Sequence, residues 1–270
     1  MKRRPDPMPR THRWRTNVIQ VPMMAASTIV CGSLSLLSSL FDRSGRVQHR
    51  IAHIWARSLL WCSGCPLTVN GAENLRKYPV VVFAANHTSY MDTPVVFGAL
   101  DCQFRILAMK KLWPVPIIGW WLNRSGQIPI DMTNPGATLS SLGAAIKALR
   151  AGMPLFIFPE GGRTTDGALQ PFLSGAAFLA IRAQVPVVPI ALSGVFDLLP
   201  PHTRHFYPSA LTMSVGEPIV TVGMNLRQMD DLTERVKGAI AAMMEEQAEP
   251  ALAEAPMALA SSEPGPAVDV

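Results

Sequence analysis

The feature that most limits the fold is an alternation, from Pro66 onward, of short apolar runs with stretches of helical composition. Apolar runs with few charges are typical of strands that are buried on both faces of a parallel sheet. We predict strands at Val80–Ala85, Phe104–Ala108, Gln127–Ile130, Pro154–Phe158, Val185–Leu192 and Ala210–Val215. We predict helices at Ala137–Arg150 and Gly175–Ala183, in the gaps between strands. The pattern therefore predicts an α/β fold with a central mixed, mostly parallel sheet flanked by helices.

The length and composition narrow the class of protein further. With 270 residues, the chain is long enough for one large domain, and its composition excludes collagen-like, fully disordered and disulfide-scaffold proteins. Of its residues, 49% are hydrophobic and only 16% are charged, whereas about 25% are charged in an average soluble domain. We therefore expect part of the apolar surface to face lipid.

The four cysteines are too few for a disulfide framework in a chain of this size, which indicates a reducing compartment. They are Cys31, Cys62, Cys65 and Cys102. Cys62 and Cys65 form a single CxxC pair with no second pair and no histidine at zinc-finger spacing. We therefore expect buried thiols and no metal site.

The N-terminal region has the charge pattern of a membrane anchor. Residues 1–16 hold six Lys or Arg against Asp6, and we expect a basic tail, solvated or lying against anionic lipid headgroups. We expect a membrane-associating helical segment over residues 17–65. Within it, Asn17–Phe41 runs 25 residues without a charge, and about 20 apolar residues can cross a bilayer. Arginines flank this run on both sides, which favours a re-entrant or hairpin arrangement, with both ends in the cytoplasm, over a single crossing.

Residues 47–62 have apolar side chains at helical spacing and predict an amphipathic helix at the membrane interface. A helix that packs only on its own domain is the alternative. The expected apolar face comprises Val47, Ile51, Ile54, Trp55, Leu59 and either Trp61 or Cys62. After this helix we expect a main domain over residues 66–240 and a disordered, acidic, Ala- and Pro-rich tail over residues 241–270.

The first candidate for chemistry is Asn86–Asp92, which directly follows an apolar strand and contains His87 and Asp92 at His-x4-Asp spacing. On an ideal helix these two positions point about 140° apart, so their side chains can meet only across a turn. Thr88 and Ser89 would supply that turn. A neutral histidine whose second ring nitrogen donates to a carboxylate is a general base able to take a proton from a hydroxyl near pH 7.

A second motif, Phe158–Thr164, also follows an apolar strand. Its Gly161-Gly162 turn lets the backbone approach a ligand, and Arg163 offers a planar fork that matches phosphate. Either motif alone is more often structural than catalytic. Because both follow strands of one apolar scaffold, the combination indicates an active site at the strand ends. The chain has no Gly-x-Ser-x-Gly elbow, so nothing marks a serine nucleophile.

Four blocks in a fixed order make the sequence resemble the glycerolipid acyltransferases related to 1-acyl-sn-glycerol-3-phosphate acyltransferase. Asn86–Asp92 looks like that family's Asn-His-x-Ser-x-x-Asp block, and Lys110–Asp131 looks like its second block. Phe158–Thr164 is similar to its Phe-Pro-Glu-Gly-Thr-Arg block, and Val185–Pro189 is similar to its last. The resemblance spans roughly residues 50 to 222.

The resemblance implies a mechanism and a set of partners. His87 would be the general base on the acceptor hydroxyl, with Asp92 as its partner. Transfer would be direct, without a cofactor or covalent intermediate, from acyl-CoA or acyl carrier protein to a lysophospholipid, with 1-acyl-sn-glycerol-3-phosphate as first choice. The headgroup would be bound by Glu160, Gly161, Arg163 and Lys110, although Lys110 could equally be an ordinary solvated lysine.

The resemblance also implies a location. Residues 66–240 would be the acyltransferase catalytic domain, held on the cytoplasmic face of a membrane, in bacteria the inner membrane. The partners would be the acyl donor, the lysophospholipid acceptor and membrane lipid, with no nucleic acid.

Two departures from the family pattern leave the acceptor open. Met132 stands where members commonly have arginine after Ile-Asp, and losing a charge-assisted bond would cost about 1.5–3 kcal/mol of headgroup binding. Arg124 could substitute for it. Leu173 stands where many members have lysine. The alternatives are an acyltransferase for another lysolipid, with another headgroup or a lyso-aminolipid, and a non-catalytic lipid-binding scaffold, which the intact His87 and Asp92 disfavour.

Overall fold

The computed structural model describes residues 10–42, 44–131, 133–200, 203 and 205–253, and it is built around one sheet of seven strands. The strands are β1 (Leu67–Asn70), β2 (Val82–Ala85), β3 (Arg105–Met109), β4 (Ile128–Ile130), β5 (Leu155–Ile157), β6 (Val187–Ser193) and β7 (Leu211–Val215). Their order across the sheet is β1-β7-β6-β2-β5-β3-β4. Every neighbouring pair is parallel except β6 and β7, which confirms the predicted mixed, mostly parallel sheet.

All six predicted strands are present, and β1 was missed. Strand β1 lies at the sheet edge, and its residues alternate between half-buried and exposed, so it lacks the continuous apolar run that marks a central strand. The two predicted helices are α6 and α7. The helices of the structure are α1 (Arg10–Arg15), η1 (Thr16–Gln20), α2 (Val21–Ser38), α3 (Arg46–Ser63), η2 (Ala72–Arg76), α4 (Asp92–Ala99), η3 (Lys110–Leu112), α5 (Ile118–Arg124), α6 (Pro135–Arg150), α7 (Gly175–Ala183), α8 (Val195–Leu198), η4 (Leu226–Gln228) and α9 (Met229–Ala253).

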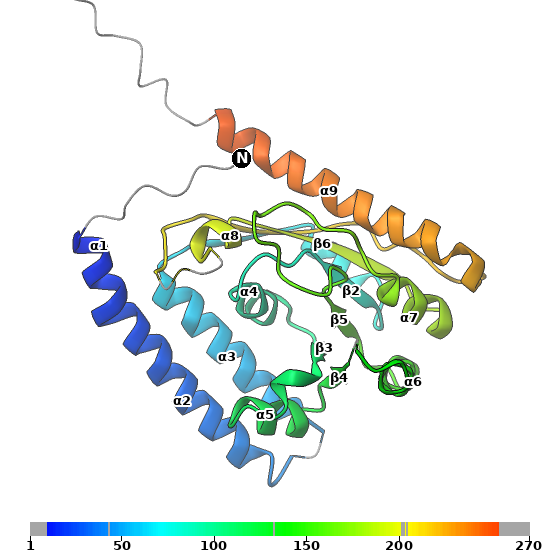
Figure 1. The fold of residues 1–270 in the computed structure, drawn as a ribbon, viewed down its shortest axis with the longest axis horizontal. Helices are drawn as coiled ribbons and strands as arrows, with labels where there is room; N and C mark the ends of the chain where they lie inside the picture. The colour runs from blue at the N-terminus through cyan, green and yellow to red at the C-terminus, as the bar shows by residue number, and fades with distance from the viewer. Residues whose placement is uncertain (1–9, 43, 132, 201–202, 204, 254–270) are drawn as a thin grey trace, which may run out of the picture.

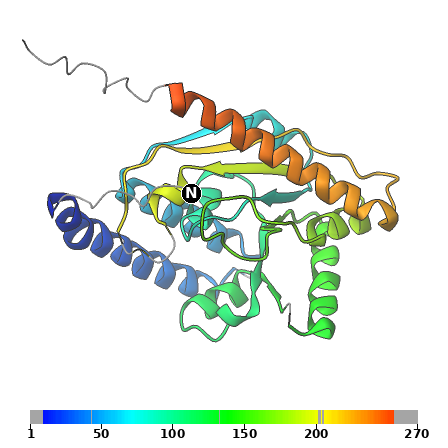
Figure 2. The same cartoon turned by 45° about the horizontal axis from the view of Figure 1, so that its top comes forward.

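Helices cover both faces of the sheet, so the core has two halves (Figures 1 and 2). Strand β2 contributes to both, because successive side chains of a strand point to opposite faces. Phe83 and Ala85 pack in the half that includes α3 and α4, whereas Val82 and Ala84 pack in the half that includes α6, α7 and α9. Burial on both sides explains why the strand sequences are apolar throughout.

The N-terminal helices fold back as an antiparallel pair, α2 against α3, and we call residues 13–63 the N-terminal hairpin (Figure 1). At its open end, Nε2 of Gln20 donates to the carbonyl oxygens of Cys62 and Ser63, at 3.1 and 3.0 Å. Halfway along, Nε1 of Trp55 donates to Oγ1 of Thr28 at 3.0 Å. Because α3 also packs against α4, the hairpin is fastened to the main domain along its length.

Helix α3 does not present the single apolar face that the sequence predicted. Val47, Ile54 and Trp61 are exposed, whereas Leu59, from the same expected face, is buried with Ala56 against the main domain. The helix lies between α2 and α4, so the alternative of packing on its own domain describes most of its surface.

The two predicted tails need correction where the structure describes them. Residues 241–253 continue helix α9 and are not disordered, because alanine and glutamate are strong helix formers as well as common tail residues. Arg10–Arg15, predicted as part of a tail, are helical, and Thr16 is fully buried. Residues 1–9 and 254–270 lie outside the described residues. The predicted domain boundaries remain predictions.

Gly119 shows how closely the backbone packs at the start of α5. A Cβ at this position would lie 1.8 Å from the carbonyl oxygen of Trp113. We predict that Gly119→Ala lowers the free energy of unfolding by about 1–3 kcal/mol, as overpacking does. Urea unfolding checks this. Gly143→Ala is the matched control, because Gly143 lies inside α6 with no neighbour within 4 Å of its Cβ, and it should raise the free energy by about 0.5–1 kcal/mol. A neutral Gly119→Ala would contradict the packing argument.

Candidate active site

The carboxyl ends of the adjacent strands β2 and β5 bring the two motifs together. The register pairs Ala84 with Ile157, so residues 87 and 160, each three positions further on, lie opposite each other. Asn86 fixes the end of β2 against β6. Its Nδ2 donates to the carbonyl oxygen of Leu192 at 3.0 Å, and the Leu192 N–H donates to its Oδ1 at 2.7 Å. The sheet therefore holds the position of His87.

His87 and Asp92 are hydrogen bonded, with Nδ1 of His87 2.7 Å from Oδ2 of Asp92. The chain turns through Thr88 and Ser89, and α4 begins at Asp92, so the turn that the spacing required is present. Asp92 is fully buried, and its Oδ2 also accepts from the backbone N–H groups of Thr88 and Ser89, at 2.6 and 2.8 Å. With Nδ1 engaged by the carboxylate, Nε2 of His87 is left to face a substrate.

Phe158, at the end of β5, packs against the His87 imidazole. The two rings are stacked, with centroids 4.0 Å apart and planes at 15°. The His87 side chain keeps 17% of its surface exposed, so the ring is held on one face and open along part of its edge. Nothing in the sequence predicts this ring contact, although Phe158 is the first residue of the second motif.

Glu160 supports the loop that holds His87. Its Oε1 accepts from the His87 backbone N–H at 2.7 Å, and its Oε2 accepts from the Gln170 backbone N–H at 3.1 Å. Burial raises the pKa of Glu160 to about 7; the two backbone hydrogen bonds oppose this shift, and the charge of Asp92 adds to it. The carboxylate that the sequence suggested for headgroup binding is therefore engaged with backbone groups.

Arg163 lies beside the histidine motif. Gly161 has a φ of 70°, which favours glycine and turns the loop after β5. The Thr164 N–H then donates to the His87 carbonyl oxygen at 3.0 Å, which joins the two motifs again. Arg163 directly precedes Thr164. Its guanidinium lies over the ring of Tyr90, 3.5 Å from the ring centroid, as a cation–π pair. Arg163 and Tyr90 are both exposed, so this cation is open to an anionic ligand.

Lys110 follows β3, so it lies at the carboxyl ends of the parallel strands, as His87 does. Its ammonium group is paired with a carboxylate. Its Nζ is 3.6 Å from Oδ2 of Asp131, which follows β4. Hydrogen bonds from Thr133 lower the pKa of Asp131, and the charge of Lys110 lowers it further. The neighbouring carboxylate partly neutralises Lys110, which weakens the expected contact with phosphate.

Arg124 does not supply the positive charge that is missing at positions 132 and 173. Arg124 ends α5, and β4 begins four residues later, so Arg124 lies at the amino-terminal edge of the sheet and cannot replace an arginine at position 132. Met132 itself lies outside the described residues. Leu173 is close to the site, because its N–H donates to the carbonyl oxygen of Pro159 at 2.8 Å. The position that is often lysine in the resembling family therefore adjoins Glu160 and has no charge here.

The four cysteines, Cys31, Cys62, Cys65 and Cys102, are free thiols. Within the part of the chain that the structure describes, no three or more His, Cys, Asp or Glu side chains are grouped to hold a metal ion.

Comparison with known proteins supports the resemblance seen in the motifs. The sequence model of the acyltransferase family matches residues 66–193. The chain is 32% identical over 163 residues to a chloroplast 1-acyl-sn-glycerol-3-phosphate acyltransferase, BAT2, of Brassica napus. This match covers 60% of the chain and 47% of that protein, so the chain spans about half of the relative's length. A 1-acyl-sn-glycerol-3-phosphate acyltransferase of Limnanthes douglasii is 28% identical over 71% of the chain and 68% of its own length.

The fold also matches a solved structure. The crystal structure of the 1-acyl-sn-glycerophosphate acyltransferase PlsC from Thermotoga maritima superposes with a TM-score of 0.74, over 87% of this chain and 97% of that one. The sequences are 22% identical, so this likeness concerns the fold.

The raised pKa of Glu160 predicts a pH-dependent stability. The native state keeps a proton on Glu160 up to pH about 7, whereas the unfolded state loses it near 4.5. The contribution to stability is therefore complete below the unfolded pKa and is lost as the pH rises through about 7. We predict that Glu160→Gln flattens the fall in the free energy of unfolding between about pH 5 and pH 8. Urea unfolding at several pH values measures it. Glu73→Gln, at an exposed position, should keep the wild-type slope, and equal slopes in Glu160→Gln and wild type would refute the assignment.

Proposed function

We propose that this protein is a member of the acyltransferase family, whose sequence model matches residues 66–193, and that it transfers a fatty acyl group to the free hydroxyl of a lysophospholipid. The proposed acceptor is 1-acyl-sn-glycerol-3-phosphate, which gives phosphatidic acid, and the donor is acyl-CoA or acyl carrier protein. The names of the relatives support the acceptor. The observation on which the chemistry rests is the hydrogen bond between His87 and the buried Asp92.

The proposed reaction is a direct transfer. Nε2 of His87 takes the proton of the acceptor hydroxyl while the hydroxyl oxygen forms a bond to the thioester carbonyl carbon. The carbon–sulfur bond then breaks, and the leaving thiolate takes the proton back from Nε2. Asp92 holds Nδ1 protonated and stabilises the imidazolium that forms in between. A thioester already has a good leaving group, so positioning both substrates replaces a covalent enzyme intermediate.

The first kinetic prediction concerns the base. His87→Ala should lower kcat by about 10²–10⁴-fold, the usual contribution of a general base, and Asp92→Asn should lower it less, because the imidazole remains. Turnover of purified protein with an acyl thioester and 1-acyl-sn-glycerol-3-phosphate checks this. Circular dichroism is the control for folding. Turnover close to wild type in folded His87→Ala would exclude the general-base role.

The proposed headgroup contact is Arg163. Its guanidinium is exposed beside His87, and a planar fork can make two hydrogen bonds to a phosphate. Lys110 is paired with Asp131, and Leu173 is uncharged, so Arg163 has the largest share in holding an anionic headgroup. This weaker set of cations also favours testing acceptors with other headgroups.

The second kinetic prediction follows from this arrangement. Arg163→Ala should raise the KM for 1-acyl-sn-glycerol-3-phosphate about tenfold or more, with little change in the KM for the acyl donor. Arg163→Lys should restore little, because an ammonium cannot form the bidentate contact. Arg124→Ala is the matched control at the opposite edge of the sheet and should behave as wild type. Equal changes in both KM values, or an unchanged acceptor KM, would count against the role of Arg163.

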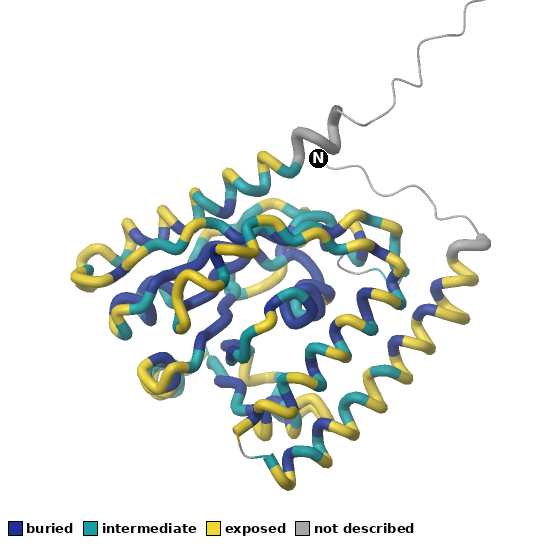
Figure 3. Tube along the Cα trace, turned by 180° about the vertical axis from the view of Figure 1, so that it is seen from behind, coloured by how far each residue is buried: buried dark blue, intermediate teal, exposed yellow. Residues whose placement is uncertain are grey.

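We propose that the N-terminal hairpin lies on the membrane. Within the described residues, one continuous helical stretch is long and apolar enough to span a bilayer. It is Arg13–Ser38, which comprises the end of α1, η1 and α2, and it has a mean hydropathy of 1.6, with 11% of its apolar window buried. Its outer side is exposed (Figure 3), and Val30, Leu34 and Leu37 lie along one face at helical spacing. Because α2 is fastened to α3, and α3 to the main domain, insertion with this face in the lipid keeps the catalytic domain at the surface.

This arrangement also supports a cytoplasmic location. The hairpin begins and ends on the same side, with Arg13 and Arg15 at its start and Arg46 and Arg50 after its turn, and basic residues next to an apolar segment favour the cytoplasmic side. Acyl thioesters are made in the cytosol, so an enzyme on that side meets its donor directly.

Substitution of the outer face tests the membrane proposal. The triple variant Val30→Gln, Leu34→Gln, Leu37→Gln should bind anionic phospholipid vesicles at least tenfold more weakly, because each side chain loses apolar burial in lipid. Its activity on a short-chain soluble acceptor should stay near wild type. Vesicle co-flotation measures the binding. Leu139→Gln, at an exposed position of α6, is the matched control. Unchanged flotation of the triple variant would exclude this face as the anchor.

A further inference from the structure

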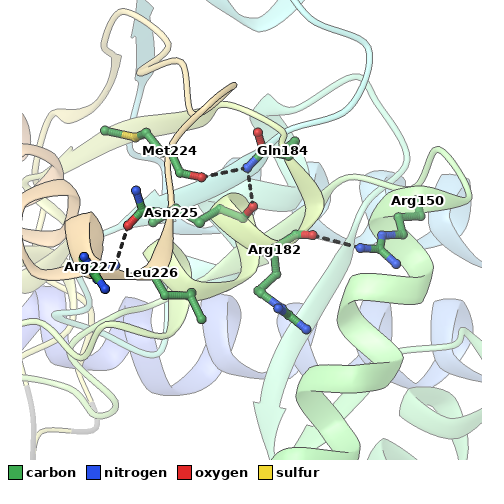
Figure 4. A pocket seen from close by; sticks show the side chains of 8 residues that line it. Arg150, Arg182, Gln184, Met224, Asn225, Leu226 and Arg227 are labelled. Carbon is green, nitrogen blue, oxygen red and sulfur yellow. Dashed lines mark hydrogen bonds between the residues drawn. The ribbon is translucent and has the colours of Figure 1, made fainter.

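A second site lies outside the His87 region, where α6, α7 and the segment before α9 meet (Figure 4). It is a cavity of about 620 Å³. Its lining consists of Arg150, Ile181, Arg182, Gln184, Met224, Asn225, Leu226 and Arg227. None of these residues belongs to the motifs that the proposed function uses.

The cavity lies at the amino ends of the parallel strands, whereas His87 lies at their carboxyl ends. Helix α6 leads into β5 and helix α7 leads into β6, so Arg150 and Arg182 precede strands that run parallel to β2. His87 follows β2 at the other edge. Strand β6 has seven residues, which at about 3.3 Å each separates the two edges by roughly 20 Å. Figures 1 and 2 also place α6 and α7 on the far side of the molecule from α2.

Three arginines from three separate segments give the cavity a charge that nothing in its lining balances. Arg150, Arg182 and Arg227 are exposed, and among the described residues no carboxylate lies within 4.0 Å of their guanidinium groups. Arg150 donates through Nη2 to the Arg182 carbonyl oxygen at 3.1 Å, which places its guanidinium beside α7. A helix C-terminus favours a nearby cation, which accounts for Arg150 and Arg182, but Arg227 lies outside both helices.

The acidic residues nearest to Arg227 along the chain contact other side chains. Asp231 is 3.9 Å from Arg235 on α9, and Oδ1 of Asp230 accepts from Oγ of Ser174 at 3.5 Å. The positive charge of the cavity therefore faces solvent.

The wall of the cavity is fixed by Gln184. This residue has a φ of 57°, a left-handed conformation that is uncommon for residues other than glycine. Its Nε2 donates to the carbonyl oxygens of Ile181 and Met224, at 2.6 and 3.1 Å, and its Oε1 accepts from the Gly223 N–H at 2.8 Å. One amide thus fastens the segment that holds Arg227 to the end of α7. The hydrogen bonds hold the cavity in shape without a ligand.

We propose that this cavity binds a small phosphate-bearing organic molecule, with phosphate at the arginines and an apolar part against Leu226 and Met224, at a site separate from His87. Guanidinium groups match phosphate oxygens in geometry and charge. The volume is that of a typical small-molecule site. The cavity faces away from the N-terminal hairpin, so its phosphate comes from a soluble molecule and not from lipid in the membrane that the hairpin contacts.

Calorimetric titration of the full chain in detergent tests the proposal with ADP, pyrophosphate and adenosine as probes. ADP should bind saturably and more tightly than pyrophosphate, and adenosine should not bind. The double variant Arg182→Ala, Arg227→Ala should weaken ADP binding at least tenfold. Arg163→Ala should leave it unchanged, which separates this cavity from the proposed headgroup site.

The matched control is Arg57→Ala, which removes an exposed arginine on α3, outside the cavity, and should not weaken binding. Circular dichroism checks folding; if the double variant is unfolded, the single variant Arg227→Gln replaces it, with a threefold or greater loss expected. The proposal is overturned by absent or non-saturable ADP binding, by pyrophosphate binding as tightly as ADP, or by equal losses in Arg57→Ala. Competition between ADP and the acyl donor would also overturn it, because it would place ADP at the donor site.

Discussion

The site depends on the hydrogen bonds that the buried carboxylate of Asp92 accepts. This carboxylate has no exposed surface, yet it accepts hydrogen bonds from the His87 ring and from the backbone of Thr88 and Ser89. A buried charge is tolerable only when it is paired and hydrogen bonded in this way. The same bonds that satisfy Asp92 therefore shape the turn after β2 and orient the imidazole. Stability and chemistry at this position cannot be separated.

The sheet explains why distant parts of the sequence meet, and why others do not. Parallel strands β2 and β5 place His87 opposite Glu160, and the Glu160 carboxylate then secures the His87 backbone. The same rule sends Arg124 to the other edge, together with the arginine-lined cavity at the ends of α6 and α7. One sheet thus separates a proposed catalytic edge from a proposed phosphate-binding edge, and the hairpin packs beside the first through α4.

The sequence could predict features that depend on neighbours along the chain, and it failed where distant contacts decide. The central strands and the meeting of His87 with Asp92 follow from apolar runs and from a spacing that demands a turn. The stacking of Phe158 on His87 and the pairing of Lys110 with Asp131 depend on strand order, which no local pattern contains. The prediction of a disordered tail was wrong over residues 241–253 for another reason. A composition rich in alanine and glutamate suits both a helix and a solvated tail.

The most direct test of the central claim is the protonation of the two His87 ring nitrogens, measured by ¹⁵N NMR of the full chain at a pH where the imidazole is neutral. If Asp92 holds Nδ1–H, the spectrum should show Nδ1 protonated and Nε2 bare, and Asp92→Asn should mix the two tautomers. A wild-type His87 protonated mainly at Nε2, or one whose tautomer does not respond to Asp92→Asn, would contradict the account.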